Sequence, residues 1–145
     1  MIDRLIYVIF VNDSYMKDIA LTVLRIGIGI IFMKHGSAKL FGGIKSWHWL
    51  GNQMGNLGIT FAPLFWGFMA AISEFFGGLS FILGFGIRIS ALFLICVMLV
   101  AIAMHYTQGD SWIKISYPIS MLLVFITFLI AGAGPYSLSA YFDFL

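Results

Sequence analysis

The chain has 145 residues, of which 61% are hydrophobic and 10% are charged, and its formal net charge is +2. A mean hydropathy of +1.02 lies far outside the range of soluble domains and predicts an integral membrane protein. The basic residues are dispersed, which argues against nucleic-acid binding. The single cysteine, Cys96, excludes an intrachain disulfide, and we interpret it as a small buried apolar residue within a span.

Four apolar stretches are each close to the ~20 residues that cross ~30 Å of hydrocarbon. They are residues 18–41, 61–83, 88–106 and 115–133. The sequence therefore predicts an all-α fold: a single membrane domain over residues 1–145, built as a four-helix bundle with both termini on the same side. Before the first span, apolar residues at helical spacing predict that residues 1–17 lie along the membrane surface.

The first span carries charge where hydrocarbon is expected to exclude it. One stripe of this helix holds Arg25, Gly29, Phe32, Gly36 and Lys39, with His35 beside Gly36. The stripe is therefore expected to face protein or water and not lipid, because buried charges in a bilayer need partners. Its two glycines, Gly29 and Gly36, are candidate helix-packing positions.

Residues 42–60 contain five glycines and two asparagines together with Trp47, His48 and Trp49. This composition predicts a loop at the level of the lipid headgroups. Trp47 and Trp49 are most simply anchors at the membrane interface. A loop of this length could alternatively cover a ligand site.

Glu74 stands out in the second span because small residues flank it on both sides. They are Ala70, Ala71, Gly77 and Gly78. This face has little side-chain bulk, so a neighbouring helix can approach closely, with Gly77 and Gly78 as packing positions. A lone carboxylate in such a contact is costly, and Glu74 is expected to be protonated, paired or hydrated.

Counting residues along the helices sorts the ionisable groups into two layers. At ~1.5 Å per residue from the side that holds the termini, Arg25 lies about 10 Å and Glu74 about 13 Å into the bundle. We therefore expect these two residues to form an ion pair. The same count places His35 and His105 together near the opposite mouth, about 25 Å in, with Lys39 just outside.

Each layer also has a purely structural interpretation. A buried ion pair can fix helix register without any chemistry, and the histidines can be hydrogen-bonded packing residues. A haem held by both histidines is a weaker alternative, because only helical spacing supports it. No third ligand stands at a recognisable spacing, so no metal site is predicted.

The chain resembles the DoxX family of small four-helix bacterial membrane proteins over roughly residues 21–142. The resemblance rests on Leu24-Arg25 followed by Gly29, on His35-Gly36-x-x-Lys39-Leu40-Phe41, on Glu74 followed by Gly77-Gly78, on Gly84 with Arg88, on His105, and on Gly132-x-Gly134-Pro135-x-Ser137-Leu138. Ser139 departs from the family pattern, which commonly has aspartate there. The resemblance implies a multi-pass protein of the bacterial cytoplasmic (inner) membrane. It also implies links to thiosulfate:quinone oxidoreductase subunits and to membrane complexes that handle thiol and oxidative stress.

The leading hypothesis is a redox-associated membrane subunit that binds a quinone or a similar amphipathic molecule in an intramembrane cavity. Its polar lining would be Arg25, His35, Lys39, Glu74 and His105, and its aromatic walls Phe32, Trp66, Phe75 and Phe76. These residue types fit because a quinone needs a proton donor near each carbonyl oxygen and apolar surroundings. Redox partner proteins and a second copy of the chain are candidate partners besides the lipid bilayer. Whether the chain is itself an enzyme stays open.

Two further functions compete with this one. In the first, the protein is a non-catalytic assembly or chaperone-like membrane protein whose buried polar residues only fix helix packing. In the second, it is a small-solute or proton transporter, which the buried charges fit but which lacks an evident internal repeat. Basic residues are shared equally between the two sides, so the sequence leaves the orientation of the termini open.

Overall fold

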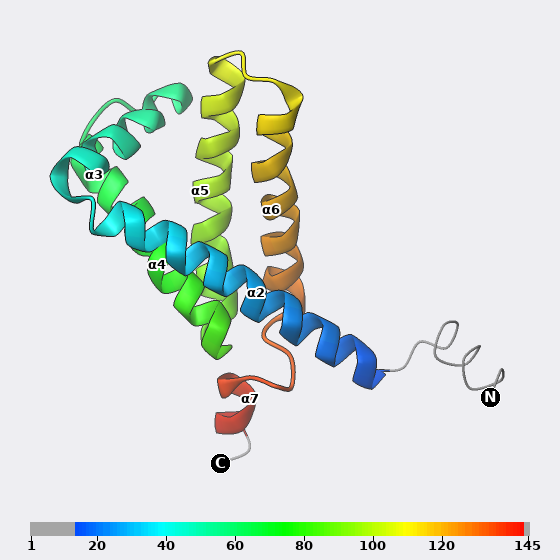
Figure 1. The fold of residues 1–145 in the computed structure, drawn as a ribbon. Helices are drawn as coiled ribbons and strands as arrows, with labels where there is room; N and C mark the ends of the chain where they lie inside the picture. The colour runs from blue at the N-terminus through cyan, green and yellow to red at the C-terminus, as the bar shows by residue number, and fades with distance from the viewer. Residues whose placement is uncertain (1–13, 144–145) are drawn as a thin grey trace.

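The computed structural model describes residues 14–143, and every regular element in that range is helical. The elements are α2 (Ser14–Leu40), α3 (Gly43–Asn52), the 3-10 helix η1 (Gln53–Leu57), α4 (Pro63–Leu83), α5 (Ile87–Thr107), α6 (Trp112–Ala131) and α7 (Leu138–Asp143). Figure 1 shows α5 and α6 side by side, with α2 and α4 crossing them obliquely. The predicted surface segment, residues 1–17, lies mostly outside the described residues.

Three helices between residues 14 and 143 are long and apolar enough to cross a membrane: α4, α5 and α6. Their mean hydropathies are 1.4, 2.6 and 2.0. They match the predicted spans 61–83, 88–106 and 115–133 within a few residues. The remaining predicted span, 18–41, forms α2, which is 27 residues long. As expected for a first-turn proline, Pro63 opens α4.

Among the described helices, α2 and α4 make the most extensive contact, and glycines allow it. A Cβ atom added at Gly36 would lie 2.2 Å from the backbone nitrogen of Phe75, and one at Gly78 would lie 2.3 Å from that of Met33. At Gly29 the nearest atom would be the carbonyl oxygen of Gly78, at 2.7 Å. The two backbones therefore touch, as at small-residue helix contacts in membranes.

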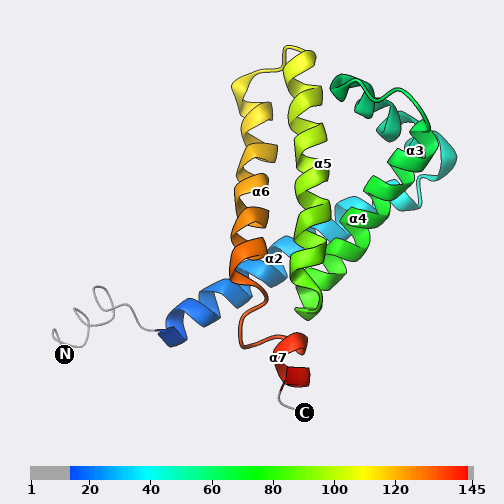
Figure 2. The ribbon, with the colours of Figure 1, turned by 180° about the vertical axis from the view of Figure 1, so that it is seen from behind.

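The apolar core lies where α2, α4, α5 and α6 converge. Phe81, Leu94, Phe125 and Phe128 are fully buried there. Gly77 belongs to this region and not to the contact with α2, since its added Cβ would meet Leu94 at 3.1 Å. Phe81 packs edge-on against both core phenylalanines of α6. Above this core, α4 and α5 diverge toward the end of the molecule that holds α3 (Figures 1 and 2).

Residues 43–57 are helical, so the prediction of a loop over residues 42–60 is wrong. One of the glycines that indicated a loop, Gly51, serves instead as a helix contact, together with Gly67 of α4. An added Cβ at Gly51 would fall 1.6 Å from the carbonyl oxygen of Pro63, and one at Gly67 would fall 1.6 Å from that of Trp47. Helix α3 therefore packs backbone to backbone against the first turns of α4. Trp47 joins this contact, with its ring 4.8 Å from that of Phe68.

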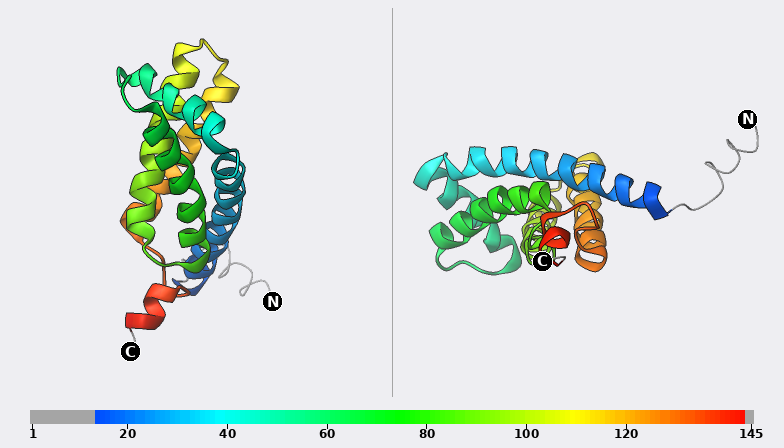
Figure 3. Two further views of the ribbon diagram at one scale, coloured as in Figure 1. Left: turned by 90° about the vertical axis from the view of Figure 1, so that its left-hand side faces the viewer. Right: turned by 90° about the horizontal axis from the view of Figure 1, so that it is seen from below.

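Helix α2 runs across one side of the other helices and extends past them at its N-terminal end (Figure 3). At the opposite end of the chain, α7 returns to the turn between α4 and α5. The backbone N–H and the hydroxyl of Ser139 both donate to the carbonyl oxygen of Gly84, at 3.2 and 2.9 Å. Ser139 therefore fastens the C-terminal segment to this turn.

Candidate functional site

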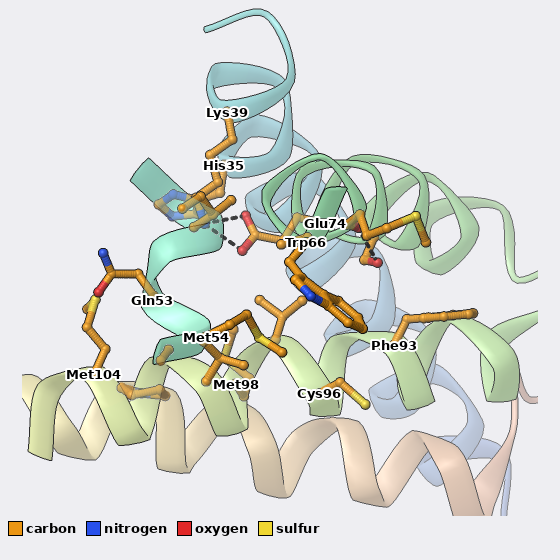
Figure 4. A pocket seen from close by; sticks show the side chains of 18 of the residues that line it. His35, Lys39, Gln53, Met54, Trp66, Glu74, Phe93, Cys96, Met98 and Met104 are labelled. Atoms are coloured by element: carbon orange, nitrogen blue, oxygen red, sulfur yellow. Dashed lines mark hydrogen bonds and ion pairs between the residues drawn. The ribbon is translucent and has the colours of Figure 1, made fainter. Parts of the chain in front are cut away.

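A cavity of about 460 Å³ lies between α2, α4 and α5, with α3 and η1 covering one end and Tyr117 and Pro118 of α6 reaching it. Most of its lining is apolar or aromatic. The ionisable or amide groups that line it are His35, Lys39, Gln53, Glu74, Cys96, His105 and Tyr117. Figure 4 shows this cavity with its side chains.

Lys39 and Glu74 form an ion pair in the wall of the cavity. The Lys39 ammonium donates to both oxygens of the Glu74 carboxylate, at 2.5 and 2.7 Å (Figure 4). The Glu74 side chain is 2% exposed and the Lys39 side chain 33% exposed. Because a carboxylate this deeply buried is costly without a counter-charge, the Lys39 ammonium stabilises Glu74 between apolar helices.

The predicted pairing of Arg25 with Glu74 is wrong. The Arg25 guanidinium, whose residue is 1% exposed, donates instead to the carbonyl oxygens of Phe81, at 3.0 Å, and Tyr136, at 2.7 Å. The first of these carbonyls belongs to the last turn of α4, where helix carbonyls lack partners within the helix and the helix dipole is negative. Arg25 therefore caps α4 and does not line the cavity.

The pairing was predicted from a residue count along the helices. That count placed Asp18 of α2 at the same depth as Leu83, the last residue of α4. In the structure, Gly29 lies against Ile82 instead. A Cβ atom added at Gly29 would be 2.8 Å from the backbone nitrogen of Ile82. The first turns of α2 thus project beyond α4, and Glu74 comes level with residues 36–39 of α2.

The two predicted histidines line the same cavity. His35 lies in α2, where its ring meets that of Phe32 edge-on at 6.4 Å. His105 lies near the end of α5, where its Nδ1 atom is 2.7 Å from Oδ2 of Asp110. In the described range no hydrogen bond joins the two histidines, and no three His, Cys, Asp or Glu side chains gather into a group that could hold a metal ion.

Asp110 links the His105 imidazole to the solvent-facing turn between α5 and α6. Its other oxygen accepts from the Lys114 ammonium at 2.6 Å. The hydrogen bond with His105, and after it the one with Lys114, holds the pKa of the Asp110 carboxyl below its ordinary value. Asp110 is therefore ionised at neutral pH and fixes the orientation of the imidazole.

Among the predicted wall residues, Phe32 and Trp66 line the cavity. Phe75 and Phe76 do not; the Phe75 ring packs against Phe41 at 6.2 Å, and Phe76 is 53% exposed. The Trp66 indole Nε1 is buried, and no group in residues 14–143 accepts its hydrogen. A buried N–H donor without an acceptor is costly, which makes Trp66 a candidate ligand contact.

A family model named DoxX matches residues 20–107, more than half of the chain. The chain belongs to the DoxX family. No curated protein and no solved structure matches it.

The DoxX segment carries nearly all of the cavity. It contains α3, η1, α4, α5 and most of α2, and only Tyr117 and Pro118 of the lining lie beyond it. His105 of α5 lines the cavity as predicted, and residues 42–60 cover it as one of the two predicted alternatives, but other lining residues of α3, η1 and α5 were not predicted, among them Trp49, Gln53 and Phe93. The interpretation of Cys96 as a buried residue is wrong, because Cys96 is exposed and lines the cavity. In an α5 that is apolar all round, helical periodicity holds no signal to separate core, lipid-facing and cavity positions.

Proposed function

We propose that this DoxX-family membrane protein is a redox-associated subunit that binds a quinone or a similar amphipathic molecule in the cavity between α2, α4 and α5. The observation that carries the proposal is the combination of a mainly apolar cavity with a few convergent polar groups. A volume of about 460 Å³ falls within the range of roughly 300–1,000 Å³ that is typical of small-molecule sites.

The donors around the cavity fit a ligand with carbonyl oxygens. Trp66 offers a buried N–H that no group in residues 14–143 accepts. Lys39 has three N–H donors, of which two are directed at Glu74. A bound quinone supplies two carbonyl oxygens that accept hydrogen bonds and, on reduction, protons.

His105 is suited to exchange protons between the cavity and water. Because ionised Asp110 accepts from Nδ1–H, the neutral imidazole keeps its free lone pair on Nε2. Asp110 lies in the turn that joins α5 to α6, and Lys114 lies in the first turn of α6, both outside the predicted spans 88–106 and 115–133. His105 would thus take or release a proton at Nε2, with Asp110 holding the ring in place.

The proposal includes a membrane arrangement of four spans with both termini on the same side, in the cytoplasmic membrane of a bacterium. Helix α2 supports the fourth span: its 27 residues cover about 40 Å at ~1.5 Å each, enough to cross a bilayer at an angle. Its Arg25 side chain is buried and bound to carbonyl oxygens, and is thereby shielded from lipid. Redox partner proteins would receive or supply the electrons.

A non-catalytic assembly protein is the second candidate. Its support is that Arg25 acts only as a helix cap and that the charges of Lys39 and Glu74 neutralise each other. In this interpretation the polar residues fix the register of α2 on α4 and bind no ligand.

The test is binding of decylubiquinone to the protein purified in a mild detergent, measured by tryptophan fluorescence. Trp49 and Trp66 line the cavity, so bound quinone should quench their emission saturably, and quenching should fall in Trp66→Phe. Lys39→Met should weaken binding. Lys34→Met on the same helix removes an exposed lysine outside the cavity and should leave binding unchanged.

Molecules that co-purify with the protein provide a second test of the proposed function. Solvent extraction should yield co-purifying quinone, and a Soret band would instead point to haem. Absence of both, together with quenching that rises linearly and identically in Trp66→Phe, favours the assembly function.

A further inference from the structure

The cavity is polar at one end and apolar at the other. In Figure 4 the side chains of His35, Lys39 and Gln53 lie toward one end, whereas Phe93 and Cys96 lie toward the other. The Trp66 indole lies between the Lys39–Glu74 pair and α5 (Figure 4). A ligand that matches this lining has one polar head and an apolar tail.

The polar end is covered on the side of the α5–α6 turn. Gln53 and Met54 of η1 line the cavity there, and η1 contacts α5. The Thr107 hydroxyl donates to Oδ1 of Asn56 at 2.6 Å, which ties η1 to the end of α5. Since α3 is fixed to α4 through Gly51, this cover is held from both sides.

The apolar end reaches the outer surface of the bundle at the middle of α5. A stripe of exposed side chains at helical spacing marks the outward face of this helix: Ile89, Leu92, Phe93, Cys96 and Leu99. Phe93, which is 47% exposed, and Cys96 belong both to this stripe and to the cavity lining. Both lie near the middle of a 21-residue helix, at the depth of the lipid tails.

We infer that the ligand is a single-headed amphiphile that enters the cavity sideways from the bilayer, between α4 and α5, past Phe93 and Cys96. This inference rests on the proposed function and adds the route and the orientation to it. The head moves toward Lys39 and the histidines, and the tail stays in the gap at Phe93 and Cys96, in contact with lipid. The walls of this gap are apolar, so a ligand tail that enters from the lipid strips no polar group of water. A charged ligand that came from water would have to cross hydrocarbon to reach the gap.

The native cysteine tests the route directly, since Cys96 is the single cysteine of the chain. In phosphatidylcholine proteoliposomes, pyrene maleimide dissolved in the bilayer should label Cys96, and a disulfonated stilbene maleimide should not, from either side. Decylubiquinone at about ten times its Kd should slow the pyrene labelling roughly tenfold, because only the ligand-free fraction reacts.

The double variant Cys96→Ala, Leu92→Cys provides the matched control. Leu92 lies on the same exposed stripe of α5 but does not line the cavity. Its cysteine should react with pyrene maleimide at a rate that decylubiquinone leaves unchanged. It also shows that a thiol at this depth reacts with the reagent.

Four results would overturn the route. Labelling of Cys96 by the charged reagent means that the cavity opens to water. Failure of Cys96 to react while the Leu92→Cys thiol reacts means that the gap is closed. Shielding of both thiols until detergent denaturation means that a second copy of the chain covers this face. Labelling unaffected by a quinone that quenches Trp66 means that the ligand lies elsewhere. By contrast, a quinone that fails to quench Trp66 at all contradicts the proposed function itself.

Discussion

Lys39 on α2 and Glu74 on α4 form a two-pronged ion pair, with the ammonium nitrogen 2.5 and 2.7 Å from the two carboxylate oxygens. Their burial is unequal, because the Glu74 side chain is 2% exposed and the Lys39 side chain 33% exposed. Removing one partner therefore has a different cost from removing the other. The more deeply buried charge suffers more when it is left alone.

Lys39→Met should destabilise the protein more than Glu74→Gln. The first variant leaves a buried carboxylate without its counter-charge, for which a cost of about 3–5 kcal/mol is typical. The second leaves an ammonium that reaches the cavity. Thermal unfolding in detergent measures both, and the double variant Lys39→Met, Glu74→Leu should recover most of the lost stability. A Glu74→Gln variant that is the less stable of the two would contradict the unequal burial.

Arg25→Met should lower the Tm and leave quinone binding unchanged. The substitution removes the donors that satisfy the carbonyl oxygens of Phe81 and Tyr136, and buried acceptors left without partners cost roughly 1–3 kcal/mol each. Because Arg25 does not line the cavity, the Kd for decylubiquinone should stay within about twofold in the folded variant. A large rise in Kd with an unchanged Tm would place Arg25 in the binding site instead.

Asp110 should make the stability depend on pH at the acid end. Its pKa is lower in the folded protein than in the unfolded chain, so the unfolded state binds more protons as the pH falls. The stabilisation from its hydrogen bonds with His105 and Lys114 is therefore complete above about pH 4 and is lost below it. Tm measured against pH should fall less steeply below pH 4 in Asp110→Asn than in the wild type. Parallel curves would show that Asp110 does not contribute.

Gly67→Ala should detach α3 from α4. A methyl group at this position would fall 1.6 Å from the carbonyl oxygen of Trp47. The nearest atoms all belong to the backbone, so no flexible side chain can move aside to make room. The loss of stability should reach at least the 1–3 kcal/mol that overpacking typically costs. Gly55→Ala, in η1, meets nothing within 4 Å and is the matched control. Equal Tm values for the two variants would contradict the backbone contact.

Reporter fusions should distinguish four spans from three. If α2 crosses the membrane, fusions near Ile2 and at Leu145 report the same side, and an insertion at Gly109 reports the other. Gly109 suits the insertion because it lies in the turn between α5 and α6, with open space around it. If α2 does not cross, the fusion near Ile2 will agree with Gly109 instead of with Leu145.

The sequence by itself determined the class of the protein, three of its spans and most of the polar residues around the cavity. These follow from local physics: lipid requires long apolar helices, and charges within them require partners. The identity of those partners was decided only by the tertiary structure. The partner of Glu74 depends on how far α2 slides along α4, and the glycine contacts at Gly29, Gly36 and Gly78 set that distance.

The same division holds for the cover and the opening of the cavity. Gly51 falls in the stretch that the sequence predicts as a loop and Gly67 in a predicted span, and only the approach of two backbones shows them to be the contact that fixes α3 on α4. Cys96 sits in a helix that is apolar on every side, so its exposure is decided by where α4 and α5 diverge. The sequence pattern indicates which environment each residue prefers. The register of α2 on α4 and the divergence of α4 from α5 arise instead from the packing of segments that are distant in the chain.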